Sequence, residues 1–171
     1  MFGLIGFGRE MTENTIRCPL TTAIVKRVTS EFGFEVTTAG FSSMKPGTWI
    51  QPHNGYEGYS DYVVRLHLGL VVPKEREKCA IRVGNEQRSW ESGKVFIFDD
   101  FLTHEAWNHS NETRIILLMD LKYVKKPYLK AKIEHRVDIN VNTPHFSNGL
   151  KGLLTNIDEQ PRENDAMKYF K

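Results

Sequence analysis

Two histidine–arginine pairs are the residues of this sequence best suited to chemistry. His53 is followed by Arg65, and His104 is followed by Arg114. Neutral imidazole is the commonest side-chain ligand of a redox metal, and guanidinium grips a carboxylate with two hydrogen bonds. A site that holds both an iron ion and a dicarboxylate needs both residue types on neighbouring strands. These four residues are therefore the candidate site.

Each of these residues also has an ordinary structural explanation. A lone histidine is more often a core or surface residue than a ligand, and His109, His135 and His145 are interpreted in that way. Arg65 is open to a role in a surface salt bridge, the commoner fate of an arginine. Arg114 directly precedes the apolar run 115–118 and is open to a role as a simple cap of that strand, but a guanidinium there is costly to bury unless it is paired. That position favours an anionic partner.

Short β-prone runs separated by turn formers make up most of the interior of the sequence. Many short strands at close turn spacing predict a β-sandwich or barrel, with helical turns only near 20–30 and 127–135. In the run 62–72, alternation places Val64, Leu66, Leu68 and Leu70 on one face and Arg65 and His67 on the other. The expected strands are 34–43, 48–51, 62–72, 80–83, 87–90, 94–98 and 113–121.

Length and composition predict one domain over residues 1–171, with a core at about 34–121 and a C-terminal extension at about 122–171. The net charge of +2 gives no global field for nucleic acid. The basic run that begins the extension is interpreted as a solvated face. Cys18 and Cys79 are too few for a disulfide framework or a zinc site, which favours a reducing setting.

The apolar segment 1–8 lacks a preceding basic region and is broken by glycine, so it does not read as a secretory signal. No stretch approaches the roughly 20 apolar residues that span a bilayer. We therefore expect a soluble, cytoplasmic protein with no membrane span.

Four segments in order carry a specific resemblance over about half of the chain: FSSMKPGTWIQPHNG, RLHLGLVVP, IRVGNEQRSWESGKVFIFDDFLTHEAWN and RIILLMDL. They resemble the aspartyl/asparaginyl β-hydroxylase family, a branch of the iron(II)- and 2-oxoglutarate-dependent oxygenases. The resemblance implies a mainly β fold, a double-stranded β-helix of jelly-roll type with a few flanking helices. The pattern of short strands independently agrees with it.

The same resemblance implies the site residues. His53 and His104 are implied as the two protein ligands of Fe(II). A second set is implied to bind the co-substrate 2-oxoglutarate: Ser42, Arg65, Leu66, His67 and Arg114. Arg114 would hold the distal carboxylate through a charge-assisted bidentate contact, with Arg65 and His67 beside it and Ser42 as a hydroxyl donor.

One departure from most non-haem iron oxygenases is visible two residues after His53. The carboxylate that usually stands there is replaced by Gly55. The aspartyl/asparaginyl branch likewise lacks it, although iron halogenases also use a small residue there, which keeps halogenation as an alternative. Asp100 is a tentative catalytic residue that would hydrogen-bond a metal-bound water, and turn chemistry is the equal alternative for Asp99 and Asp100.

The expected reaction is a dioxygenase hydroxylation of an unactivated C–H bond with molecular oxygen. The substrate is expected to be the β-carbon of an aspartyl or asparaginyl residue or of a free amino acid. An acyl chain of a lipid is an alternative, as are a cupin-like metal protein with another activity and a non-catalytic binding module. The substrate would meet a rim made by the loop 56–61, Trp107 and the segment near Lys125.

Overall fold

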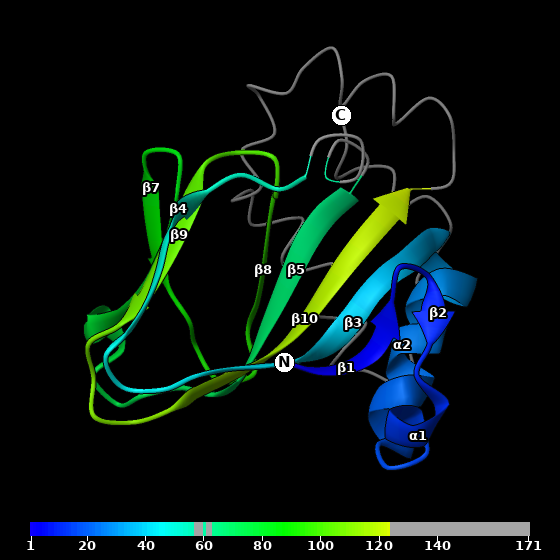
Figure 1. Ribbon diagram of the computed structural model, residues 1–171. Helices are drawn as coiled ribbons and strands as arrows, with labels where there is room; N and C mark the ends of the chain where they lie inside the picture. Colours follow the sequence, from blue (N-terminus) through cyan, green and yellow to red (C-terminus); the bar gives the residue numbers. More distant parts are fainter. Residues whose placement is uncertain (57–59, 61–62, 124–171) are drawn as a thin grey trace.

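The computed structural model describes residues 1–56, 60 and 63–123, which form two β-sheets with helices on one side (Figure 1). The larger sheet has the order β2 (Arg9–Glu10), β1 (Phe2–Gly6), β3 (Phe34–Met44), β10 (Arg114–Tyr123), β5 (Val63–Val71), β8 (Val95–Phe98). The smaller sheet has the order β4 (Thr48–His53), β9 (His104–Asn108), β6 (Cys79–Val83), β7 (Glu86–Ser89). The helices are α1 (Thr12–Thr15), α2 (Pro19–Phe32) and the 3₁₀ turn Arg76–Lys78.

The chain crosses repeatedly between the two sheets. Strands β3, β5, β8 and β10 lie in the larger sheet, whereas β4, β6, β7 and β9 lie in the smaller one. This alternation of antiparallel strands between two facing sheets is the double-stranded β-helix, so the expectation of a mainly β jelly roll with few helices is confirmed.

The two faces of the larger sheet bury different residues. Helix α2 lies along the outer face of the larger sheet (Figure 1). Its Val25 and Val28 pack in one cluster with Leu66 and neighbouring apolar side chains. On the inner face, a second cluster that includes Trp90 and Ile116 lies between the sheets. Because side chains alternate along β5, Leu66 faces α2 while Arg65 and His67 face the smaller sheet. The polar face predicted from the sequence is thus an inner face.

Several elements differ from the sequence expectation. The apolar segment 2–6 forms β1 and pairs with β3. Strand β9 was not predicted, and the helix predicted near 20–30 runs from Pro19 to Phe32, where Gly33 ends it at a φ of 70°. The helical turns expected at 127–135 and nearly all of the extension lie outside the described residues, so the domain division stays a prediction. Within the described residues, no helix is long and apolar enough to cross a membrane.

Candidate metal and carboxylate site

The two predicted metal-binding histidines lie side by side at the ends of neighbouring strands. His53 of β4 and His104 of β9 are direct partners in the sheet register, and their ring centroids are 4.2 Å apart. The Nδ1–H of His53 donates to the carbonyl of Gln51 at 2.7 Å, and that of His104 donates to Leu102 at 2.8 Å. Since a carbonyl only accepts, the proton of a neutral ring lies on Nδ1 in both histidines, and Nε2 is then the nitrogen with the lone pair that a metal binds.

The protonation state of the buried histidine also suits a metal. Burial lowers the pKa of His104, opposed by the Leu102 carbonyl and by Asp100, so the ring is neutral at pH 7. Among residues 1–56, 60 and 63–123, no group of three or more His, Cys, Asp or Glu side chains is arranged to hold a metal ion. The arrangement therefore offers two imidazoles, as the sequence predicted, and their role as ligands stays a prediction.

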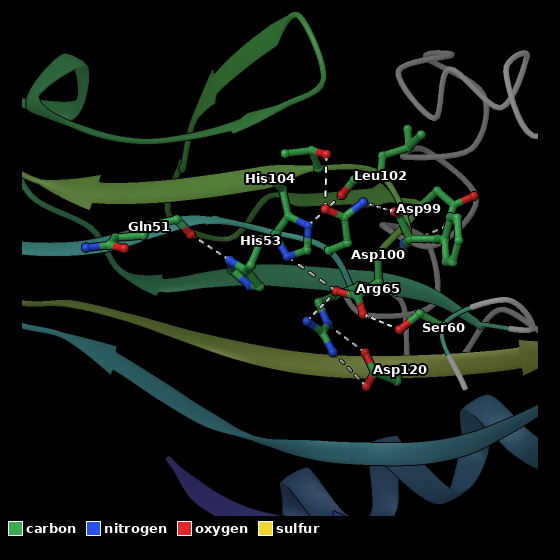
Figure 2. Close-up of polar contacts among 12 residues, drawn as sticks. Gln51, His53, Ser60, Arg65, Asp99, Asp100, Leu102, His104 and Asp120 are labelled. Atoms are coloured by element: carbon green, nitrogen blue, oxygen red, sulfur yellow. Dashed lines mark hydrogen bonds and ion pairs between the residues drawn. The ribbon is translucent and has the colours of Figure 1, made fainter. Parts of the chain in front are cut away.

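Asp100 enters this site from the turn between β8 and β9. Its buried Oδ2 accepts a hydrogen bond from Ser60 Oγ at 2.7 Å, and its Oδ1 lies 3.5 Å from Nε2 of His104 (Figure 2). The neighbouring Asp99 instead accepts from the backbone N–H of Phe101 at 3.1 Å. Asp99 thus makes a hydrogen bond typical of a turn, whereas Asp100 lies beside His104, and the catalytic role expected of Asp100 stays a prediction.

Gly55 has no room for a side chain. Its N–H donates to the carbonyl of Asp100 at 2.9 Å, and a Cβ on residue 55 would overlap with Ser60 Oγ and Asp100 Oδ2. The space where a carboxylate two residues after His53 would begin is therefore occupied by the Ser60–Asp100 pair. An acid is present beside the histidines, but it comes from a different part of the chain.

Arg65 is held by two carboxylates. Its Nε and Nη2 donate to the two oxygens of Asp120 at 2.7 and 3.0 Å, and its Nη1 forms an ion pair with Asp100 (Figure 2). The prediction that Arg65 grips a co-substrate remains untested, but its guanidinium already has acidic partners. Sequence reasoning missed Asp120. The sequence did contain a sign of it: Asp120 is an even number of residues after Arg114, so both side chains lie on the inner face of β10. There Asp120 is the register partner of Arg65.

His67 presents a single unused donor. Its Nδ1 accepts a hydrogen bond from the indole N–H of Trp90 at 3.4 Å, so the ring proton is on Nε2. That Nε2 is buried and has no hydrogen-bond partner among the described residues. Burial, together with the positive charges of Arg114 and Arg65, holds the pKa of His67 well below its usual value. His67 is therefore a neutral imidazole whose Nε2–H has no acceptor among the described residues.

Arg114 is a buried cation with no acidic partner among the described residues. Only 2% of its surface is exposed, its Nη1 donates to the Ser42 carbonyl at 3.3 Å, and its Nε has no partner there. Its Cζ lies 4.4 Å from the centroid of the Trp90 ring, and the thiol of Cys79 is also a neighbour. Burial lowers the pKa of Arg114 to about 10. Such a charge is costly unless an anion joins it.

The structure corrects two expectations about residues near the site. The side chain of Leu66 belongs to the core cluster under α2, on the opposite face of β5 from His67, so it does not line the site. Trp107 lies opposite Trp49 and stacks on His109 at the outer face of the smaller sheet, because alternation along β9 turns it away from His104. Ser42 shares the inner face of β3 with Met44. Most of the loop 56–61, and Lys125, lie outside the described residues.

Comparison with known proteins identifies relatives. The family model described as aspartyl/asparaginyl beta-hydroxylase matches residues 1–123. An ornithine lipid ester-linked acyl 2-hydroxylase of Rhizobium tropici is 44% identical over 153 residues, covering 87% of this chain and 50% of that protein. The aspartyl/asparaginyl beta-hydroxylase of Mus musculus is 39% identical over 114 residues, covering 67% of this chain and 15% of that protein.

This chain thus spans half the length, or much less, of these relatives. Among solved structures, the cupin domain of Schizosaccharomyces pombe Cnp3 is similar at 14% identity and a TM-score of 0.42, covering 64% of this chain and 71% of that one.

Proposed function

The chain belongs to the aspartyl/asparaginyl β-hydroxylase family, and we propose that it is an iron(II)- and 2-oxoglutarate-dependent hydroxylase of an unactivated C–H bond. One observation carries the proposal. Two buried N–H donors, Nε2 of His67 and Nε of Arg114, have no partner among the described residues. They lie on the inner face, where the Phe98 ring contacts the rings of both His67 and His104. A dicarboxylate at a metal would satisfy these groups.

The fit to the proposed groups can be assigned residue by residue. His53 and His104 would hold iron(II), which with 2-oxoglutarate and oxygen supplies the oxidising power for hydroxylation. Arg114 would pair with one carboxylate of 2-oxoglutarate, and the N–H of His67 would donate to a carboxylate oxygen. Asp100, fixed by Ser60, is the candidate to hold a water beside His104.

The charge around Gly55 supports hydroxylation over halogenation. A halide ligand would need the space that the missing carboxylate leaves beside His53. That space contains the Asp100 carboxylate, whose Oδ2 would overlap with a Cβ on residue 55. A second anion there would meet like charge in a buried setting, which is unfavourable.

Two substrate classes are proposed for the hydroxylation. The family name supports an aspartyl or asparaginyl side chain or a free amino acid. The acyl chain of a lipid is favoured by the extent of similarity to the lipid hydroxylase. The match to the lipid hydroxylase covers 87% of the 171 residues, so it must continue past residue 123, where the family match ends. The match to the mouse aspartyl/asparaginyl hydroxylase covers 67%, which fits within residues 1–123. Ile50, an inner-face residue of β4 that is 41% exposed, adds an apolar surface near His53.

The metal and co-substrate are tested by anaerobic titration with iron(II) and 2-oxoglutarate. The wild-type protein should develop the visible charge-transfer absorption of the chelate, and His104→Ala should lose it. His109→Ala, which changes an exposed histidine just after β9, is the matched control and should keep the absorption. Absence of the band in folded wild type, or its survival in His104→Ala, would refute the assignment.

The substrate class is tested by succinate release with a panel of free amino acids, short acidic peptides and acyl lipids. Coupled turnover should place one added oxygen on one class only, as seen by mass spectrometry. Oxygen on an acyl lipid alone would reject the aspartyl proposal and leave the hydroxylase proposal standing. A chlorinated product in the presence of chloride would favour the halogenase alternative.

A further inference from the structure

Trp90 contacts both residues that carry an unsatisfied donor on the inner face, His67 and Arg114. It follows directly after β7, is only 1% exposed and belongs to the core cluster between the sheets. Its indole N–H reaches His67, and its ring lies under the guanidinium of Arg114. No sequence motif marked this residue as part of the site, and it has no chemistry of its own to contribute there.

The contact with His67 determines where the histidine proton lies. An indole nitrogen donates and never accepts, so Nδ1 of His67 must be the acceptor in the 3.4 Å contact. A neutral imidazole carries one proton, which then lies on Nε2. The ring also contacts the rings of Trp90, at a centroid distance of 6.1 Å, and Phe98, at 5.1 Å. Both the tautomer and the orientation of His67 follow from its neighbours.

The contact with Arg114 is of a different kind. The Cζ atom lies 4.4 Å from the ring centroid, within the range of a cation–π interaction. With no carboxylate partner among the described residues, Arg114 depends on the Trp90 face, the Ser42 carbonyl and the Cys79 side chain. The electron-rich ring face therefore stabilises the charge and fixes the guanidinium before an anion binds.

We propose that Trp90 is the positioning residue of the carboxylate site, with its N–H setting the His67 tautomer and its ring holding the Arg114 guanidinium. The ligand class is the dicarboxylate of the proposed function, on which this inference rests. One side chain thus fixes the N–H of His67 and the guanidinium of Arg114, which without it would populate other tautomers and rotamers. The site is built for an anion before the anion arrives.

Trp90→Phe separates the two contacts, because phenylalanine keeps an aromatic face for Arg114 and removes the N–H. In the metal-free protein, ¹⁵N NMR of the histidine rings should show His67 in the Nε2–H form in wild type. In Trp90→Phe the two tautomers should mix. The affinity for 2-oxoglutarate, measured with manganese(II) in place of iron, should fall about tenfold, as expected for one misdirected hydrogen bond.

Trp90→Leu removes both contacts and should weaken the same affinity about a hundredfold. Trp107→Phe is the matched control, since Trp107 lies on the outer face of the smaller sheet, and it should leave both tautomer and affinity unchanged. Urea denaturation checks that every variant is folded.

The outcomes separate the inference from the proposed function. An Nδ1–H form of His67 in wild type would overturn the role of Trp90, and so would an unchanged tautomer and affinity in folded Trp90→Phe. Failure of wild type to bind 2-oxoglutarate would instead overturn the proposed function. The tautomer measurement needs neither metal nor co-substrate, so it decides the role of Trp90 towards His67 in either case.

Discussion

Replacing Arg114 by methionine should stabilise the folded protein while weakening its binding of 2-oxoglutarate. Burial lowers the pKa of this guanidinium from its usual value to about 10. A shift of that size corresponds to ~3 kcal/mol by which the charged form opposes folding. The penalty is fully present below pH 10 and fades only as the pH rises above that value, so it is measured in full at pH 7.5.

Methionine removes this penalty and also removes favourable contacts. The cation–π contact with Trp90 contributes about 2 kcal/mol when desolvated, part of which a sulfur–aromatic contact replaces. The free energy of unfolding without ligand should therefore rise by about 1–2 kcal/mol. The affinity for 2-oxoglutarate should fall by about 2–5 kcal/mol, or roughly 30- to 5,000-fold, because a desolvated charge pair is lost.

The assay is urea denaturation at pH 7.5 without ligand, combined with titration of 2-oxoglutarate in the presence of manganese(II). Arg82→Met is the matched control, since Arg82 is an exposed arginine paired with Glu105, and both quantities should stay within about 0.5 kcal/mol of wild type. If Arg114→Met lowers the unfolding free energy and leaves the affinity unchanged, Arg114 is a structural residue and the reasoning fails.

Three further predictions concern the surroundings of the site. Gly55→Ala should lower the urea-unfolding free energy by about 1–3 kcal/mol, because its Cβ displaces Ser60 and Asp100; an unchanged value would show that they move freely. Asp120→Asn should lower it by about 1–3 kcal/mol, since it removes a carboxylate that accepts two hydrogen bonds from Arg65 while Asp100 stays as the second ion-pair partner, and an unchanged value would contradict that pairing. Because burial lowers the pKa of His67, the unfolded state takes up a proton that the folded state resists, so stability should fall as the pH drops below about 6.5. Urea midpoints at pH 7.5 and 5.5 should differ less in His67→Gln, and equal differences would exclude His67 as a cause.

Alternation along strands was the most reliable guide to this fold. It placed Arg65 and His67 on one face of β5, and the structure shows that face turned to the smaller sheet. It failed for β9, where His104, Glu105 and Asn108 leave little apolar contrast between the two sides. The segment 2–6 was examined as a targeting signal and not as a strand, because its partner β3 is more than 30 residues away in the sequence.

The site was predictable where residue type alone suggested chemistry and unpredictable where the register between neighbouring strands, or core packing, decided it. His53 and His104 come together as direct register partners. The acid that holds Arg65 was hidden, because Asp120 ends an apolar run and meets Arg65 only through the β5–β10 register. Trp90 was hidden for the opposite reason, because a buried tryptophan in a core sequence suggests packing alone.

The crowding around Gly55 restricts how this protein can change over evolution. In most iron oxygenases of this chemistry, one acidic residue two positions after the first histidine completes the metal site. Here a single mutation to Asp at position 55 would have to displace Ser60 and Asp100 at once, and Asp100 is also one of the two ion-pair partners of Arg65. The route to a three-ligand centre therefore passes through a damaged intermediate unless Asp100 is removed first. Replacing Asp100 would have to come before Gly55→Asp, in evolution or in design. Sequences with an acid at position 55 are therefore more than one substitution away from this one.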